Sequence, residues 1–170
     1  VDGGTYGLES DGDLKYNPST GKVTATGFIG DISGGTGLTD AQMPAGSVLQ
    51  VVNAVDASET ATSSTTMADT GLTAAITPSA SSSKVLVMVG LSIATVGSQG
   101  GVGSRLMRGS TAIRAASEKS DGHGSGETSH HEAWVAFAYL DSPNTTSETT
   151  YKMQAKSNIS GQAVYTSIDN

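Results

Sequence analysis

Two stretches of the chain are apolar on both sides if they form β-strands. One is VLVMV, residues 85–89, and the other is AWVAFAYL, residues 133–140. Successive side chains of a strand point to opposite faces of a sheet, and antiparallel sandwiches normally keep one of these faces polar. Two explanations remain open: a protein partner covers the second face, or both strands lie in the centre of a closed barrel within one subunit.

The composition favours an all-β fold. Only 5% of the 170 residues are aromatic and 22 are glycine, so a core must consist largely of Val, Leu, Ile, Ala and Met between many turns. Residues 151–156, YKMQAK, alternate apolar and polar, which predicts a half-exposed strand. The strands expected after residue 44 are 48–54, 65–68, 73–77, 85–94, 104–108, 112–114, 132–140, 149–157 and 163–168.

Residues 1–43 form a separate segment with little core of its own, and we place a domain boundary near Pro44, so that residues 44–170 form the main domain. The segment holds two short strand candidates, near 14–16 and 23–29, around NPSTG at 17–21. Proline at the second turn position and glycine at the exit predict a hairpin. Because an isolated hairpin is marginally stable in water, we expect copies from neighbouring subunits to cover it.

Charge and residue usage argue against several classes of partner. Nine basic and sixteen acidic residues give a net charge of -7, which repels nucleic acid and anionic lipid. The absence of cysteine excludes disulfides and thiolate metal sites. The apolar stretches are far shorter than the roughly 20 residues of a membrane helix, so no membrane insertion is expected. Because the sequence opens on Val1 instead of Met, we expect a processed product or part of a longer polypeptide.

The doubly apolar stretches are the predicted oligomer interface. In residues 133–140 small alanines alternate with bulky aromatic residues, which would let side chains of adjacent subunits interdigitate around an axis. The residues assigned to this trimer interface are Val87, Val89, Trp134, Ala136, Phe137 and Ala138.

Several longer segments resemble the shaft and head at the carboxy-terminal end of tail fibres and other virion appendage proteins of marine bacteriophages. LKYNPSTGKVTATGFIGDISG at 14–34 is similar to a shaft repeat. PAGSVLQVV at 44–52, TTMADTGLTAAITPSASSSKVLVMVGLSIAT at 65–95, SRLMRGSTAIR at 104–114 and AYLDSPNTTSETTYKMQAKS at 138–157 resemble the head domain.

The resemblance implies a jelly-roll-like antiparallel β-sandwich head on a short hairpin shaft, intertwined as a homotrimer. It implies a virion location, contacts with other virion proteins, and attachment to a host-surface glycan or outer-membrane protein. Two alternatives remain: a capsid decoration or head fibre without a receptor role, and a bacterial extracellular adhesin or filament subunit.

A long polar loop at residues 115–132 is the expected receptor-contact tip, because recognition usually lies on loops held by a rigid scaffold. Its candidate contact residues are Glu118, Asp121, His123, Glu127, His130 and His131. No zinc-type ligand spacing occurs there, so no metal site is assigned. The histidines also make a pH-sensitive contact conceivable, since imidazole titrates near neutrality.

Three arginines, Arg105, Arg108 and Arg114, lie close together in an otherwise acidic sequence. They suggest a site for anionic surface sugars, because guanidinium groups bind carboxylate or phosphate in a bidentate way. The competing interpretation, which we favour, is salt bridging to Asp and Glu. Arg105 and Arg108 would face opposite sides of a regular strand.

No pattern supports catalysis or a cofactor. GHGSG at 122–126 has its serine one place away from the G-x-S-x-G pattern of serine hydrolases, and no strand-to-helix context surrounds it. An enzyme is therefore not expected. Exposed aromatic platforms for sugars are not expected either, because Trp134, Phe137, Tyr139, Tyr151 and Tyr165 all fall within predicted strands and are assigned to the core.

Overall fold

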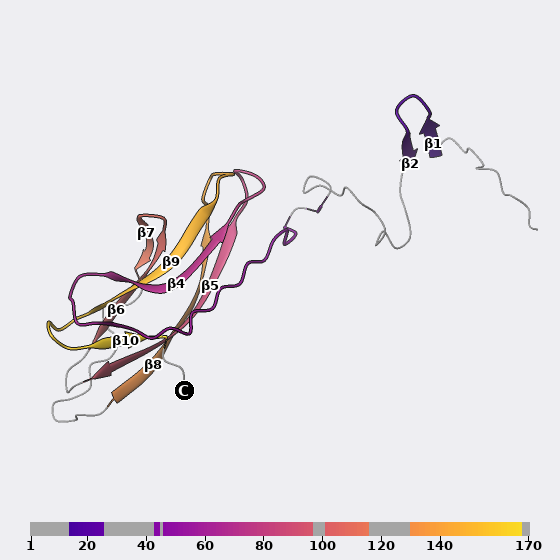
Figure 1. The fold of residues 1–170 in the computed structure, drawn as a ribbon. Coiled ribbons are helices and arrows are strands. Elements are labelled where there is room, and N and C mark those ends of the chain that lie inside the picture. Colours follow the sequence, from indigo (N-terminus) through magenta and orange to yellow (C-terminus); the bar gives the residue numbers. More distant parts are fainter. Residues whose placement is uncertain (1–13, 26–42, 45, 97–100, 116–129, 168–170) are drawn as a thin grey trace, which may run out of the picture. The chain divides into compact units, whose positions relative to one another are not determined.

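The computed structural model describes residues 14–25, 43–44, 46–96, 101–115 and 130–167 (Figure 1). The chain divides into two compact units, Val1–Ser47 and Val48–Asn170, close to the boundary expected near residue 44. The regular elements of the described residues are all β-strands, which confirms the all-β prediction. This part of the chain therefore has no helix that is long and apolar enough to cross a membrane.

The first unit contains the predicted hairpin, formed by β1 (Leu14–Asn17) and β2 (Lys22–Ala25). The Thr20 amide donates to the Asn17 carbonyl at 3.2 Å, and the Ser19 amide donates to Asn17 Oδ1 at 3.0 Å. Gly21 has a φ of 64°, a conformation that glycine adopts without a Cβ penalty. The turn therefore forms as the NPSTG sequence predicts.

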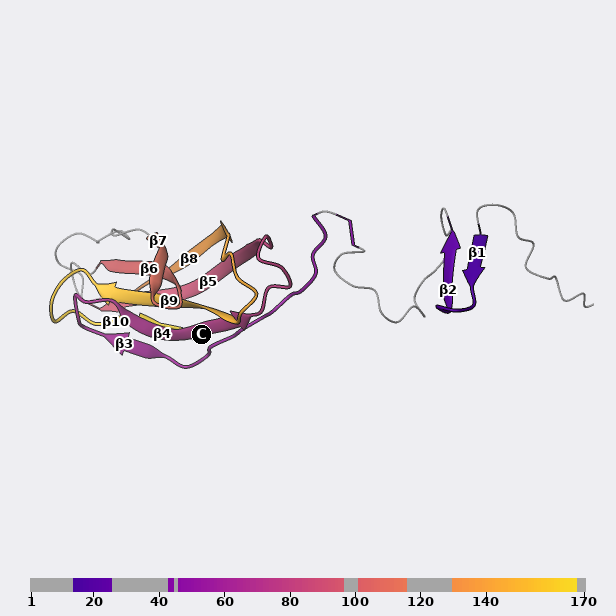
Figure 2. The ribbon, with the colours of Figure 1, turned by 90° about the horizontal axis from the view of Figure 1, so that it is seen from above.

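The second unit is an eight-stranded antiparallel sandwich with jelly-roll connectivity (Figures 1 and 2). The first sheet has the order β3-β10-β5-β8 and the second has the order β4-β9-β6-β7. Every connection between consecutive strands crosses from one sheet to the other, except the β6–β7 hairpin. The strands are β3 (Thr60–Thr62), β4 (Ala68–Ile76), β5 (Val85–Val96), β6 (Val102–Arg108), β7 (Thr111–Ala115), β8 (His130–Asp141), β9 (Thr149–Ser157) and β10 (Val164–Thr166).

The core lies between the two sheets. Leu106 and Met153, on neighbouring strands of the second sheet, are each 1% exposed and face Leu91 and Ile93 of β5 within the same apolar cluster. β9 alternates buried and half-buried side chains along its whole length, as the YKMQAK pattern predicts. The sandwich is therefore closed by one continuous core.

Two strand predictions are wrong in β4. Residues 65–68 and 73–77 were expected to be separate strands, yet Ala68–Ile76 is one strand with a register shift between Asp69 and Thr73. Gly71 lies inside this shift with a φ of 93°, and the Asp56 carboxylate packs where a Cβ would be. Gly71 was expected to lie in a turn between two strands. It lies instead in a β-bulge within one strand.

A third strand prediction fails in a different way. Residues 48–54 were expected as a strand, but they have no strand partner among the described residues and lead toward β3 as an extended chain (Figure 2). We call residues 48–55 the entry segment.

Candidate interaction surface

The two doubly apolar stretches pair with each other along their whole length. β5 and β8 form an antiparallel ladder in which Leu86 lies opposite Leu140, and Gly90 lies opposite Ala136. One face of this ladder points into the sandwich, where Val85, Val87 and Val89 pack against the core. The other face is exposed to water, so the closed-barrel explanation is wrong for these two strands.

The exposed face is rich in large apolar side chains. We call it the β5–β8 outer face, and define it by Leu86, Met88, Gly90, Trp134, Ala136, Ala138 and Leu140. Met88 and Trp134 are each 77% exposed, and Leu86 and Leu140 are 60% and 61% exposed. Burying each such side chain would contribute about 1.5–3 kcal/mol. Contiguous apolar patches of this kind typically mark interaction surfaces.

Small residues hollow the centre of this face. A shallow hollow of about 500 Å³ is lined by Met88, Gly90, Ala136 and Ala138 among others. A Cβ added at Gly90 would meet no atom within 4 Å, so the hollow is open above this glycine. The face can therefore receive bulky apolar side chains from outside.

The outer face of the second sheet has the opposite character. Arg105 Nε donates to Gln154 Oε1 at 2.7 Å, and Gln154 Nε2 donates to Asp69 Oδ1 at 2.6 Å. Lys152 Nζ forms an ion pair with Asp69 at 2.7 Å, and this contact is the main cause that lowers the pKa of Asp69. One outer face is thus a polar network suited to water, whereas the other is apolar.

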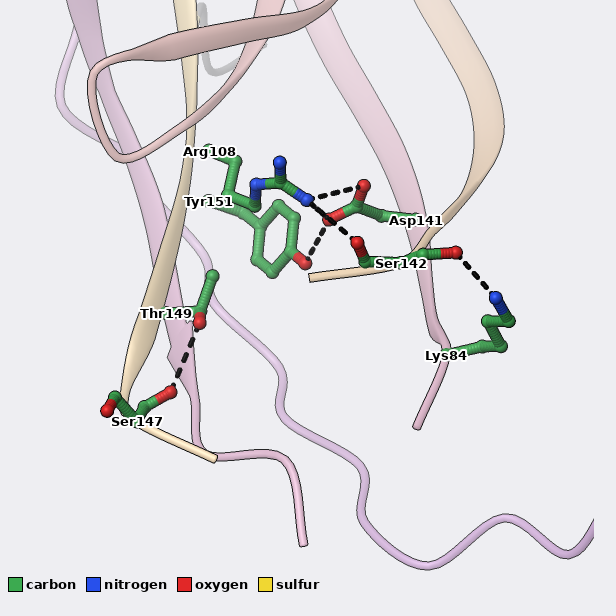
Figure 3. Close-up of polar contacts among 7 residues, drawn as sticks. All are labelled: Lys84, Arg108, Asp141, Ser142, Ser147, Thr149 and Tyr151. Carbon is green, nitrogen blue, oxygen red and sulfur yellow. Dashed lines mark hydrogen bonds and ion pairs between the residues drawn. The ribbon is translucent and has the colours of Figure 1, made fainter. Parts of the chain in front are cut away.

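A polar cluster between the sheets fixes the end of β8 (Figure 3). The Asp141 side chain is 6% exposed and accepts hydrogen bonds from Arg108 Nη1 at 3.0 and 2.9 Å. The Tyr151 hydroxyl donates to Asp141 Oδ2 at 2.7 Å, and Arg108 Nη1 also donates to the Ser142 carbonyl at 3.1 Å. A buried carboxylate is tolerated here because a cation and a hydroxyl compensate it.

The same cluster holds Tyr151 in its neutral form. Burial of the ring raises the pKa of the Tyr151 hydroxyl well above its ordinary value, and the hydrogen bond to the Asp141 carboxylate acts in the same direction. The hydroxyl is therefore a hydrogen-bond donor to Asp141 throughout the physiological pH range.

Arg114 closes the gap between the edges of the two sheets. Its Nη1 donates to the Ala138 carbonyl of β8 at 2.8 Å, and its guanidinium carbon lies 4.4 Å from the centre of the Phe137 ring. β7 and β8 are edge strands of different sheets, so this contact bridges them. It also occupies part of the backbone edge that β8 would otherwise present to another chain.

The three arginines do not converge on one site. Arg105 lies on the outer face of the second sheet, Arg108 on its inner side and Arg114 beside β8. Arg105 and Arg108 face opposite sides of β6, as the strand period predicts. Their contacts within the chain agree with the salt-bridging interpretation for Arg108, whereas Arg105 and Arg114 bind neutral acceptors.

The residues assigned to the trimer interface are divided between the two faces of the β5–β8 ladder. Trp134, Ala136 and Ala138 lie on the outer face. In contrast, Val87, Val89 and Phe137 pack against the core. The assignment of Trp134 to the core is wrong, because its side chain faces water.

The sequence did not single out Leu86, Met88, Gly90 or Leu140, which complete the outer face. Because both faces are apolar between Glu132 and Asp141, no residue in that stretch of β8 indicates which side points inward. The signal lies at the end of β8, where Asp141 faces inward and so places Tyr139 and Phe137 on the inner side.

Most of the expected receptor loop lies outside the described residues, including Glu118, Asp121, His123 and Glu127. His130 and His131 begin β8, where their backbones pair with Val96 and Thr95. Within the described ranges, no group of three or more His, Cys, Asp or Glu side chains is arranged to hold a metal ion.

Comparison with known proteins yields no relative. No protein-family model matches the chain, and neither a curated protein nor a solved structure matches it. We therefore base the proposed function on the sequence resemblance and on the geometry of the described surface.

We expect Arg108→Met to lower the free energy of unfolding by about 2–3 kcal/mol, since it leaves Asp141 buried without a cation. The cost stays below the ~3–5 kcal/mol of fully buried pairs because the Arg108 side chain is 30% exposed. Urea unfolding at one fixed protein concentration measures the change. The matched control is Lys152→Met, whose partner Asp69 is 52% exposed and for which we expect about 0–1 kcal/mol. Equal losses in both variants would contradict the assigned role of the cluster.

Tyr151 should make the protein less stable at high pH. Its pKa is raised in the folded state, so its contribution to stability is complete below the unfolded pKa of about 10 and is lost as the pH rises above that value. The free energy of unfolding of the native chain should therefore fall more steeply above pH 10 than that of Tyr151→Phe. Identical slopes in urea unfolding at these pH values would contradict this.

Proposed function

We propose that the chain is a non-enzymatic structural part of a virion appendage of the tail-fibre type, whose jelly-roll head assembles as a homotrimer and attaches the particle to a host surface. The observation that carries this proposal is the apolar β5–β8 outer face on a domain whose other outer face is polar. A domain that remains a monomer has no reason to keep Met88 and Trp134 in water.

Exposed apolar surfaces on both units of the chain support self-assembly. The outer face is uncharged between Glu132 and Asp141, so it suits an apolar protein partner. In the hairpin, Tyr16 and Val23 lie opposite each other and are 60% and 53% exposed, so this unit also presents an uncovered apolar pair. The number three comes from the sequence resemblance to phage fibres.

Threefold assembly would suit attachment. Three identical copies present three identical sets of loops, so weak single contacts with a host glycan or outer-membrane protein gain from a high effective concentration. Residues 115–132, which join β7 to β8 in the sequence, are the proposed host-contact element. The hairpin unit would join the head to other virion proteins.

We predict that the native chain has a mass in solution of three times 17.1 kDa, and that Met88→Glu reduces it toward one chain. Met88 is 77% exposed in the single chain, so the substitution leaves the fold intact. A carboxylate in a dry interface costs about 3 kcal/mol, which weakens association roughly a hundredfold. Light scattering coupled to size exclusion measures the mass.

The matched control is Ala75→Glu, which adds the same charge to an exposed position on β4 of the second sheet. This variant should keep the native mass. A native chain that elutes as a monomer at high concentration would contradict the proposed self-assembly.

The virion location requires a separate experiment. An antibody to residues 48–170 should label the tail region of phage particles under negative stain. Labelling over the capsid would instead identify a decoration or head fibre. Labelling of bacterial surfaces without particles would identify an adhesin or filament subunit, and either result would overturn the tail-fibre assignment.

A further inference from the structure

The entry segment is an uncovered apolar stretch of extended chain. Its five large apolar side chains are exposed to water: Val48 by 78%, Leu49 by 45%, Val51 by 82%, Val52 by 41% and Val55 by 82%. Within the described part of the chain, residues 48–55 take part in no hydrogen bond. The sequence predicts a strand here, and the described residues of the chain offer this segment no strand partner. An exposed segment with several large apolar side chains is suited to packing against another apolar surface.

The segment and the β5–β8 outer face of the same chain lie apart. The segment leads into β3, which is one edge of the first sheet, whereas β8 is the opposite edge. Four strands spaced by about 4.8 Å place these edges roughly 14 Å apart. Figure 2 shows the segment and β8 on different sides of the sandwich. The Asp56 carboxylate, packed against Gly71 of β4, fixes the end of the segment there.

The two surfaces match in length and character. The outer face extends from the Leu86–Leu140 pair to the Ser92–Trp134 pair, about 20 Å at ~3.3 Å per residue. Eight extended residues of the entry segment span about 26 Å. Neither surface carries a charge within these limits: Asp56 follows the segment, and Glu132 and Asp141 flank the face. A long apolar strand thus fits along a long apolar face.

The size of a stable interface also favours the use of both the entry segment and the β5–β8 outer face. Stable interfaces use about 20–30 residues on each side. The outer face comprises the few exposed positions of only two strands, so it is too small by itself. Because each copy would give its segment to one neighbour and receive a segment from another, every copy contributes both surfaces to the assembly.

We infer that the entry segment of one copy lies along the β5–β8 outer face of a neighbouring copy, with Val51 and Val55, which share one side of an extended chain, directed toward that face. This inference rests on the proposed self-assembly and names the surfaces that form it. The contact is heterologous, because it joins the entry segment of one copy to the β5–β8 outer face of the next. Heterologous contacts close into rings when the rotation allows it, which agrees with a cyclic trimer.

Disulfide trapping tests the inference, because the chain contains no native cysteine. Val48→Cys, Val51→Cys and Val55→Cys are each mixed and reassembled with Ala136→Cys, and the mixtures are oxidised. We expect at least one mixture to give a covalent two-chain product on a non-reducing gel, since a disulfide forms only when the Cα atoms come within about 4.4–6.8 Å. The double variant that combines the best pair should give a covalent three-chain product.

Each segment variant oxidised by itself should remain a single chain, and so should the control mixture of Ser81→Cys with Ala136→Cys, because Ser81 lies in an exposed turn that is not part of the segment. Ala136→Cys linking to itself would show that two outer faces meet, and would overturn the inference. Absence of linkage in all three mixtures, with native masses retained, would also overturn it while leaving self-assembly intact. A monomeric native chain would instead refute the proposed assembly.

Discussion

The hydrogen-bonded cluster of Arg108, Asp141 and Tyr151 determines how the rest of the sandwich is arranged. A strand with one polar and one apolar face has its register fixed by that pattern, since a one-residue slip would move the apolar set into water. β8 has no such pattern between Glu132 and Asp141. Its register depends instead on Asp141, whose carboxylate is compensated only when it faces Arg108 and the Tyr151 hydroxyl. The inward Asp141 and the exposed Glu132, at the two ends of the apolar stretch of β8, agree with an orientation in which Trp134 faces water and Phe137 faces the core.

The consequence is a domain with two different outer faces. The second sheet exposes a network that joins Arg105, Gln154, Asp69 and Lys152, and such a network is well solvated. The first sheet exposes Met88 and Trp134 around a hollow over Gly90. A jelly roll with this asymmetry is suited to assembly through one sheet. The entry segment adds a second uncovered apolar element near the opposite edge, so the two elements together suit a ring of identical copies.

The sequence predicts those features that depend on local patterns. NPSTG yields the hairpin turn because proline and glycine fix its backbone angles, and YKMQAK yields a half-exposed strand because its alternation matches the strand period. The apolar runs correctly indicate that β5 and β8 have a second apolar face. Their orientation was not predictable, since it depends on a contact between Asp141 and residues far away in the sequence. The bulge at Gly71 was missed for a related reason. Glycine adopts a positive φ in turns and in bulges alike, so the sequence does not distinguish the two.

In the candidate site, too, local patterns were predictable and contacts between distant residues were not. The doubly apolar stretches correctly indicated an exposed apolar surface with Trp134, Ala136 and Ala138. The other residues assigned to it are equally apolar but lie on the inner side of the ladder: Val87, Val89 and Phe137. The arginines were grouped by proximity in sequence, whereas β6 and β7 carry them to different parts of the sandwich. The strand predicted at residues 48–54 has no strand partner among the described residues of one chain, and its apolar composition alone does not indicate which surface would cover it.

Fluorescence of Trp134 tests the central claim most directly, because it is the one tryptophan of the chain and is 77% exposed in the isolated subunit. If the β5–β8 outer face is covered in the assembly, its emission should lie at short wavelength and resist quenching by iodide, and both properties should be lost in Met88→Glu. Emission and quenching typical of a water-exposed indole, identical in the native chain and in Met88→Glu at all concentrations, would contradict the account.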